Sequence, residues 1–218
     1  MAILNYSPPM SPYLHINYQD DDILVLNKPS GLLSVPGKAK EHADSMQTRA
    51  QKVFPTATIV HRLDMATSGL MVMALNKPAH RHISKQFELR ETAKTYQAIV
   101  FGTVQQDSGE IDLPLICDWP NRPKQMVDHE RGKKALTHWR VLERNTKTTR
   151  VELKPVTGRS HQLRVHMLSM QHPIIGDRLY AQDQALTMSN RLNLHGMFLS
   201  FRHPVTEQIL GFESQVPF

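Results

Sequence analysis

The sequence contains a single cysteine, Cys117, and no long uninterrupted run of apolar residues. A lone cysteine excludes an intrachain disulfide framework and a zinc site built from several cysteines, and it favours a reducing, cytoplasmic environment. No stretch approaches the ~18 apolar residues of a membrane-spanning helix. No basic segment precedes the first apolar residues, as it would in a signal peptide. The sequence also lacks internal repeats and low-complexity segments, so we expect a globular cytoplasmic protein.

The composition is that of an ordinary globular chain with an excess of positive charge. The 218 residues are 40% hydrophobic and 21% charged, and 26 Lys and Arg against 20 Asp and Glu give a net charge of +6. The basic residues are spread along the chain rather than gathered in a tail. A basic folded surface of this kind suits a polyanion, above all a nucleic acid, although the same charge would also serve solubility.

The pattern of apolar residues predicts an α+β fold with more strands than helices. Prolines in residues 1–12 indicate an extended N-terminal arm. Residues 15–29 are typical of a hairpin around an acidic turn, and Asn76 is placed to cap a helix. The remaining predictions are a helix over 43–53, strands over 59–62, 70–75, 96–104, 136–142 and 150–155, a helix capped by Ser160, a surface excursion over 107–134, and two strands from residue 192. We therefore predict a single domain over residues 1–218, built on a largely antiparallel mixed sheet flanked by helices.

The segment HRLDMATSGL, residues 61–70, contains an arginine and an aspartate followed by Thr-Ser-Gly, a combination that is unusual in a segment that only packs in a core. Ser68 and Gly69 suggest a turn before the apolar run, which would leave Asp64 on a loop at the edge of a sheet. Loops held by a rigid sheet are common positions for reactive groups. For an isolated Arg-x-Asp the simpler interpretation is that Asp64 caps a turn and pairs with Arg62 in solvent.

Three further segments are ambiguous when each is taken alone. VLNKPSGLLSVPG, residues 25–37, carries Lys28 at what could be a plain hairpin end. AKTYQAIV places Lys94 and Tyr96 on one face of a strand, where a tyrosine usually packs in a core or an interface. GRSHQLRVHM gathers two arginines and two histidines on one turn-and-helix unit, which alone would suggest a phosphate-binding helix start or a solvated basic face.

Taken together and in this order, the four segments resemble the RluA-type RNA pseudouridine synthases. The NKPxGL, HRLDxxTSGL, KxY and GRxHQxRxH patterns are all present, and they span nearly the whole chain. The resemblance implies the pseudouridine synthase catalytic fold with a central RNA-binding cleft and without an S4 domain. It implies isomerisation of a uridine in RNA without a metal or other cofactor. Its subtype implies two substrates, a uridine of the tRNA anticodon stem-loop and one of 23S rRNA.

The same resemblance implies roles for individual residues. Asp64 is the catalytic carboxylate, acting as a nucleophile or as a base on the sugar. A carboxylate in a dry site would take up a proton unless a cation lay close, and Arg164 is the expected cation; the alternative is that Arg164 binds an RNA phosphate. Tyr96 would stack on the target uracil. Arg62 would fill the place left by the flipped base, or would form a structural ion pair.

The expected substrate contacts include less specific positions. Leu163 would pack against the base or simply lie in the core, and His61 would lie at the substrate-binding site. Scattered cations would contact the RNA backbone: Lys28, Arg81, Lys85, Arg122 and Lys124. We expect no DNA or membrane partner and a monomeric enzyme.

Three alternative functions are compatible with these residues. A glycosylase or nucleoside hydrolase would also use an aspartate at the sugar, and a non-catalytic RNA-binding protein would use the same basic surface. A synthase of the same family with a different tRNA or rRNA target is the third. A zinc deaminase is excluded because its His-x-Glu and Pro-Cys-x-x-Cys pattern is absent. His161 and His166 lie five residues apart, off the spacing of a helical metal pair, so we expect them to form hydrogen bonds.

Overall fold

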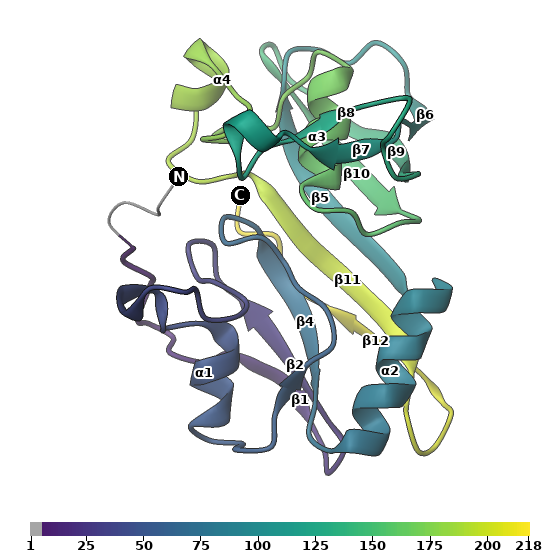
Figure 1. The fold of residues 1–218 in the computed structure, drawn as a ribbon. Coiled ribbons are helices and arrows are strands. Elements are labelled where there is room, and N and C mark those ends of the chain that lie inside the picture. The colour runs from purple at the N-terminus through teal and green to yellow at the C-terminus, as the bar shows by residue number, and fades with distance from the viewer. Residues whose placement is uncertain (1–5) are drawn as a thin grey trace. The chain divides into compact units, whose positions relative to one another are not determined.

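The computed structural model describes residues 6–218, which form two compact units (Figure 1). The first unit comprises residues 6–94 and Gly196–Pro217, and the second comprises Thr95–His195 with Phe218. The chain passes from one unit to the other within two of its strands, β5 (Ala93–Phe101) and β11 (Leu194–Arg202). Residues 1–5 of the expected N-terminal arm lie outside the described residues, and 6–12 contain no helix or strand. The prediction of a single domain remains a prediction.

The first unit is a sheet with a helix on each face. Its strands run in the order β1-β2-β4-β11, with β3 beside β4 and β12 beside β11. The pairings of β1 with β2, β2 with β4, and β11 with β12 are antiparallel. The elements are β1 Ile16–Gln19, β2 Ile23–Lys28, η1 Lys40–His42, α1 Met46–Gln51, β3 Thr58–Ile59, β4 Ser68–Ala74, α2 Lys77–Leu89, β11 Leu194–Arg202 and β12 Ile209–Glu213.

Alternation along β2 explains how both helices find an apolar surface. Ile23 and Val25 pack in one cluster with Ile83 of α2, whereas Leu24 and Leu26 pack in another with residues of α1. Successive side chains of a strand point to opposite faces, so the two helices cover opposite faces of the sheet. A strand covered on both sides has a continuous apolar run, and such runs occur at residues 23–26 of β2 and 70–74 of β4.

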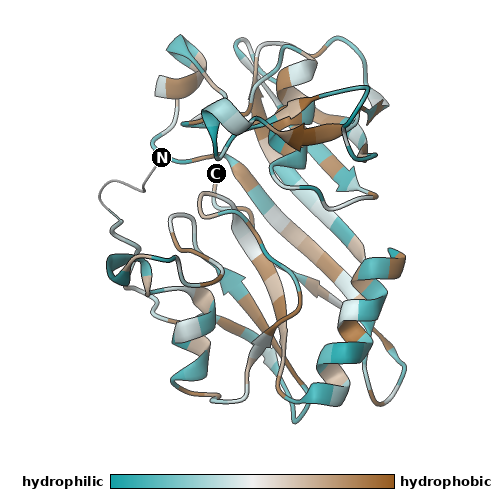
Figure 2. Ribbon diagram, in the orientation of Figure 1, coloured by the Kyte–Doolittle hydropathy of each residue, from teal (hydrophilic) through white to brown (hydrophobic). Residues whose placement is uncertain are grey.

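Local signals place α2. The side chain of Asn76 accepts a hydrogen bond from the N–H of Ala79 at 2.9 Å, and Pro78 lies in the first turn, where its missing N–H costs nothing. Ile83 and Phe87 form the apolar side of a helix that is otherwise mostly polar (Figure 2). The predicted capping residue of this helix is confirmed.

The second unit contains four antiparallel strands in the order β5-β10-β9-β6, a separate hairpin formed by β7 and β8, and two helices. The predicted surface excursion over 107–134 was wrong in part, because it contains three strands. One of them pairs with a strand of the main sheet, and the other two pair with each other in a hairpin. The elements are β5 Ala93–Phe101, β6 Ser108–Asp112, β7 Leu115–Cys117, η2 Trp119–Asn121, β8 Gln125–Val127, β9 Leu136–Arg144, β10 Thr148–Pro155, α3 Gln162–Ser169 and α4 Asp183–Thr187.

The structure confirms the predicted fold class, an α+β fold on a mostly antiparallel sheet. Among residues 6–218 no helix combines the length and the apolar character that a membrane span requires.

Candidate functional site

Asp64 lies on the loop that joins β3 to β4, as predicted, but the turn within that loop is placed differently. The C=O of Asp64 accepts a hydrogen bond from the N–H of Thr67 at 3.1 Å, so the chain turns at residues 65–66. Ser68 and Gly69, predicted to form the turn, are the first residues of β4. Gly69 has a φ of +128°, and a β-carbon there would lie 2.4 Å from the backbone of Gly196. This glycine is required by the close approach of two backbones.

The backbone just before Asp64 is fixed by one buried serine. The hydroxyl of Ser34 donates to the C=O of Leu63 at 2.6 Å and accepts from the N–H of Leu63 at 3.1 Å. Ser34 is 4% exposed and Leu63 is 8% exposed. Both backbone groups of the residue before the carboxylate are thus satisfied in a place where water has little access.

The segment 28–34, which we name the cradle, also holds the far side of the turn. The hydroxyl of Ser30 donates to the C=O of Ala66 at 2.7 Å, and the N–H of Gly31 donates to the C=O of Met65 at 2.8 Å. Asp64 is therefore flanked on both sides by residues whose backbone is bonded to the cradle. The conformation of the loop is determined by the NKPSGLLS segment, which lies thirty residues earlier in the chain.

Lys28 belongs to the cradle and not to the surface. Its ammonium donates to the C=O groups of Pro29 at 2.9 Å, Leu32 at 2.6 Å and Met65 at 3.1 Å, and the residue is completely buried. An ammonium has three protons to donate. The expectation that Lys28 contacts the RNA backbone needs correction, since its charge has no exposed surface through which to reach a phosphate.

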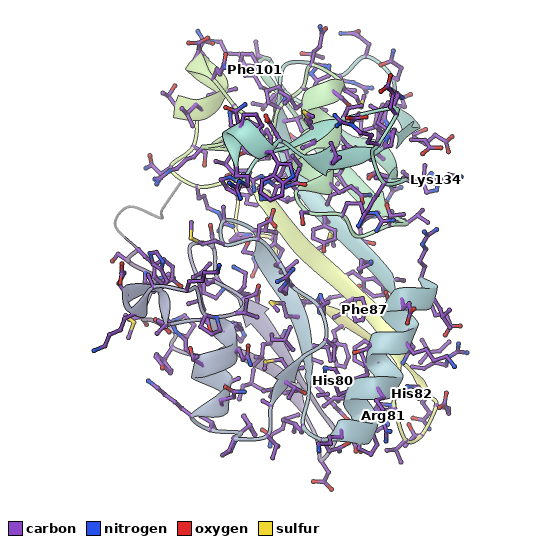
Figure 3. All side chains as sticks on the ribbon, in the orientation of Figure 1. His80, Arg81, His82, Phe87, Phe101 and Lys134 are labelled. Carbon is purple, nitrogen blue, oxygen red and sulfur yellow. The ribbon has the colours of Figure 1, made fainter. Side chains whose placement is uncertain are left out.

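His61 anchors the start of the loop. Its Nε2 accepts a hydrogen bond from the N–H of Val72 at 3.0 Å, and its ring stacks on Phe87 with centroids 4.4 Å apart. Figure 3 shows Phe87 on the side of α2 that faces the strands. Burial, and to a smaller extent the charge of Lys94, lowers the pKa of His61 to about 3. Burial also lowers the pKa of Lys94, whose Nζ lies 5.6 Å from the Phe87 centroid. His61 is thus a neutral anchor, and its contact with substrate stays a prediction.

On the loop between β3 and β4, the side chain of Arg62 is exposed to solvent and that of Asp64 is half-buried. A half-buried carboxylate on a well-anchored turn can be presented to a substrate without a change of the backbone. The structure therefore brings together Arg62, Asp64, His61 and Lys28 in the first unit, the first two as presented groups and the last two as support.

The GRSHQLRVHM segment forms α3 in the second unit, but Ser160 does not cap it as predicted. The N-terminal residue of the helix is preceded by His161 in a left-handed conformation, with φ of +53° and no capping bond from its side chain. The side chain of Gln162 instead fixes the start of the helix through four hydrogen bonds. Its Oε1 accepts from the Thr157 hydroxyl and the Arg159 N–H, and its Nε2 donates to the Leu136 C=O and to Thr137, all at 2.8–3.0 Å.

Arg164 is buried and forms a two-pronged ion pair within the second unit. Its Nε and one terminal nitrogen each lie 2.7 Å from an oxygen of Asp177, and its guanidinium lies 5.0 Å from the ring centroid of Tyr180. Arg164 is 4% exposed and Asp177 is 1% exposed. An RNA phosphate is thus a poor partner for Arg164. Its pairing with Asp64 stays a prediction, since the two residues belong to different units.

Sequence reasoning missed Asp177 and Tyr180. Asp177 also accepts hydrogen bonds from the N–H groups of Leu179 and Tyr180, at 3.0 and 3.3 Å. The Gly-Asp pair at residues 176–177 is the sequence feature that could have predicted a turn here. Gly176 has a φ of +71°. Nothing in the local sequence indicates that this turn meets Arg164.

Two other predicted positions lie in the second unit with Arg164. Tyr96 is half-buried on β5 opposite Leu153 of β10. Leu163 is 7% exposed, which fits the core alternative as well as a contact with the base. Both contacts with substrate stay predictions.

The predicted hydrogen-bonding role of the two histidines is confirmed. Nδ1 of His161 lies 2.7 Å from the hydroxyl of Tyr180. His166 contacts the Thr137 hydroxyl at 2.9 Å and the C=O of Leu113 at 3.1 Å, and burial lowers its pKa.

One cluster has the composition of a metal site, but its ligand atoms are already engaged. Atoms of Asp20, Asp22 and His203 lie within 4.8 Å of one another in the first unit. One oxygen of Asp20 accepts from the N–H groups of Asp22 and Ile23, and the other lies within 3.0 Å of the Tyr18 hydroxyl and His203. Burial acts to raise the pKa of Asp20, but these hydrogen bonds hold it below its usual value. The cluster closes the β1–β2 turn.

Comparison with known proteins identifies the family of the chain. The family described as RNA pseudouridylate synthase matches residues 22–169, which include the cradle, the Asp64 loop, β5 and α3. The chain is 54% identical over the full length of both chains to the dual-specificity RNA pseudouridine synthase RluA of Escherichia coli strain K12. It is 57% identical to the protein of that name from Vibrio vulnificus, over 94% of this chain and 84% of the relative.

Solved structures show the same relationship at lower identity. The structure of human RNA pseudouridylate synthase domain containing 1 is 29% identical with a TM-score of 0.81, and the match covers 97% of this chain and 87% of the human chain. Human RNA pseudouridylate synthase domain containing 4 is 27% identical with a TM-score of 0.74, over 93% and 88% of the two chains. The chain belongs to the RNA pseudouridylate synthase family.

Proposed function

We propose that this enzyme isomerises specific uridines of structured RNA to pseudouridine, with Asp64 as the catalytic carboxylate. The observation that carries the proposal is the turn at residues 64–67, where a half-buried carboxylate follows a residue bonded on both backbone groups to Ser34. An isomerisation within one nucleotide has no second substrate, so the enzyme must chiefly position a reactive group against that nucleotide. Positioning alone removes a large part of a reaction barrier.

The substrates we propose are a uridine in the tRNA anticodon stem-loop and a uridine in a stem-loop of 23S rRNA. Support comes from the full-length relatives named dual-specificity RNA pseudouridine synthase, together with the net charge of +6. A different tRNA or rRNA site within the same family is the alternative. We further propose that the enzyme acts as a cytoplasmic monomer on RNA alone.

The isomerisation needs no second substrate, because no group is transferred to or from another molecule except protons. The bond from C1′ to N1 breaks, the uracil turns, and C5 bonds to C1′. The hydrogen on C5 then leaves as a proton and N1 takes up a proton, so the product is an isomer of the substrate. Asp64 attacks the sugar or removes a proton from it. The uridine must be extruded from its stack for this to occur, and Arg62, the exposed cation of the loop, would take its place.

The second unit would supply the contacts to the base. We propose that Tyr96 stacks on the uracil, that Leu163 packs beside it, and that Arg164 provides the cation for Asp64. These roles rest on the family resemblance. The bidentate pair with Asp177 supports the last one indirectly, since it holds the guanidinium of Arg164 in one orientation.

Release of tritium from RNA labelled at C5 of uridine tests the proposal. Forming the C5–C1′ bond expels that hydrogen, so the wild-type enzyme should release tritium to water. Asp64→Asn should retain RNA in a filter-binding assay and should release none. Asp21→Asn makes the same change at an exposed residue of the β1–β2 turn and is the matched control, with release at the wild-type rate.

Each competing function gives a different result. A glycosylase would produce free uracil with its tritium retained, and an RNA-binding protein would release nothing. Tritium release by Asp64→Asn, in a preparation free of wild-type enzyme, would overturn the role of Asp64. A map of pseudouridines in RNA from cells lacking the protein would identify the sites. Equal rates on linear uridine oligomers and on stem-loops would contradict the proposed dependence on RNA structure.

A further inference from the structure

The hairpin of β7 and β8 ends in a closed tip at residues 118–124. The N–H of Asp118 donates to the C=O of Lys124, the N–H of Asn121 donates to the C=O of Asp118, and the N–H of Lys124 donates to the C=O of Asn121, all at 3.0 Å. The side chain of Asn121 also donates to the Asp118 carboxylate at 3.0 and 3.2 Å. These bonds fix the tip on itself.

The end of β8 next to the tip is anchored to Tyr180, which contacts the GRSHQLRVHM segment. The N–H of Gln125, the first residue of β8, donates to the hydroxyl of Tyr180 at 2.7 Å. The same hydroxyl contacts His161, and the ring of Tyr180 lies against Arg164. The tip is therefore presented by a supported strand pair.

This tip exposes the larger part of a tryptophan side chain to solvent. Trp119 is 63% exposed, whereas Trp139, the other tryptophan of the chain, is 7% exposed. The guanidinium of Arg122 lies 4.1 Å from the Trp119 ring centroid, within the range of a cation–π contact. In the described part of the chain no carboxylate pairs with Arg122, which is itself exposed. The indole and the guanidinium thus support each other while both remain accessible.

We propose that Trp119 and Arg122 form a stacking platform for an unpaired base of the substrate RNA, outside the nucleotide that reacts. The indole offers a flat face to a base, and the stacked guanidinium has N–H groups to donate to a phosphate. Lys124 adds a second cation at the tip, and the one carboxylate there, Asp118, is already bonded by Asn121. The inference rests on the proposed function, because it assigns a further contact to the same RNA.

Charge favours RNA over a protein surface as the partner. Between Asp118 and Lys124 the tip carries two cations and one carboxylate, in a chain with a net charge of +6. Base stacking on an aromatic side chain is tolerant of sequence and of partner geometry. It therefore suits an enzyme proposed to accept two RNAs that share a loop rather than a full sequence.

Tryptophan fluorescence tests the platform directly, because the two tryptophans differ so strongly in exposure. A tRNA anticodon stem-loop and the 23S rRNA stem-loop are titrated into wild-type enzyme and into Trp119→Phe, with binding followed independently by the anisotropy of labelled RNA. The difference between the two proteins reports Trp119. We expect this emission to fall as RNA binds, and its quenching by acrylamide to fall towards that of the buried Trp139.

Affinity provides a second measurement. Loss of one stacked base corresponds to about 5- to 150-fold weaker binding for Trp119→Ala. Trp119→Phe should lose less, because a ring remains, and Arg122→Ala should reduce the salt dependence of binding. Leu142→Ala truncates another exposed apolar side chain of the second unit, 38% exposed, and should bind normally. Circular dichroism verifies folding of each variant.

The outcomes separate this inference from the proposed function. Tritium release with bound RNA that leaves Trp119 as accessible as before would overturn the platform alone, and would indicate that the tip serves another partner such as a protein. RNA that protects Trp119 but releases no tritium would refute the catalytic proposal and leave the platform standing. Absence of RNA binding by the wild-type enzyme would overturn both.

Discussion

The substitution Ser34→Ala isolates the contribution of the cradle to the Asp64 loop. One hydroxyl serves both backbone groups of Leu63, donating to its C=O at 2.6 Å and accepting from its N–H at 3.1 Å. Alanine keeps the size of the side chain nearly unchanged and removes both bonds. The perturbation therefore acts on the residue next to the carboxylate without touching the carboxylate itself.

The expected loss of stability follows from the burial of the two orphaned groups. A buried donor or acceptor left without a partner costs about 1–3 kcal/mol. Because the alanine leaves room for a partial rearrangement, we expect a total of about 2–4 kcal/mol. For a chain of this size that corresponds to a melting temperature lower by roughly 4–16 °C.

Activity provides the more specific test. If the bonds of Ser34 position Asp64, then a displacement of the loop should reduce kcat by roughly 10- to 100-fold while RNA binding changes little. Ser45→Ala is the matched control. Ser45 is equally buried in the same unit, and it caps α1 through a reciprocal pair of bonds with Thr48. Its loss should cost about 1 kcal/mol and leave kcat unchanged.

Tritium release under saturating RNA, measured well below the melting temperature of each variant, separates stability from positioning. A Ser34→Ala enzyme that melts earlier but turns over at the wild-type rate would show that Ser34 stabilises the unit without positioning Asp64. A variant unchanged in both respects would refute the reasoning about the cradle as a whole.

Three further predictions concern other residues. Burial and, secondarily, the charge of Lys94 hold the pKa of His61 at about 3, below the 6.5 of an exposed histidine. As the pH falls, His61 is therefore protonated in the unfolded chain at a higher pH than in the folded chain. The contribution of His61 to stability is complete above about pH 6.5 and is lost as the pH falls towards 3, so His61→Gln should flatten the decline in urea stability between these values. Asp177→Asn should lower the free energy of unfolding by about 3–5 kcal/mol, because it leaves the buried Arg164 without its anion; a loss below 1 kcal/mol would mean that another group compensates the charge. Tyr96→Phe should keep much of the turnover, and Tyr96→Ala should lose about 5- to 150-fold in affinity for the stem-loop; equal affinity for wild type and alanine would remove Tyr96 from the base contact.

Elements governed by local chemistry could be predicted from the sequence. Asn76 and Pro78 specify the start of α2 through a side-chain bond and a missing donor, both within one turn of the chain. The acidic turn at residues 20–22 likewise closes the first hairpin, with Asp20 bonded to the two N–H groups that follow it. Such signals depend on neighbouring residues alone, and the predictions based on them are confirmed.

The longer predicted strands are present as β4, β5, β9, β10, β11 and β12, but several details that depend on distant contacts were predicted wrongly. Gly69 resembles a turn residue, yet it lies in a strand because Gly196 approaches its backbone. Ser160 resembles a helix cap, yet Gln162 organises that end of α3 through bonds to residues 136 and 137. The strands within residues 107–134 are short, and β6 acquires its regular structure from β9. In each case the deciding partner is far away in the sequence.

The cations of the candidate site differ in their exposure to solvent, and this difference cannot be predicted from residue type alone. Lys28 and Arg62 both follow the family motifs and carry the same charge, so the sequence gives each an equal claim to RNA. In the structure the ammonium of Lys28 donates hydrogen bonds to the C=O groups of Pro29, Leu32 and Met65, whereas Arg62 is exposed on the Asp64 loop. A buried ammonium is tolerated only when its protons are bonded, so Lys28 commits the cradle to one conformation. Because Lys28 donates to the C=O of Met65, the residue after Asp64, we predict that it supports the position of the carboxylate instead of contacting RNA.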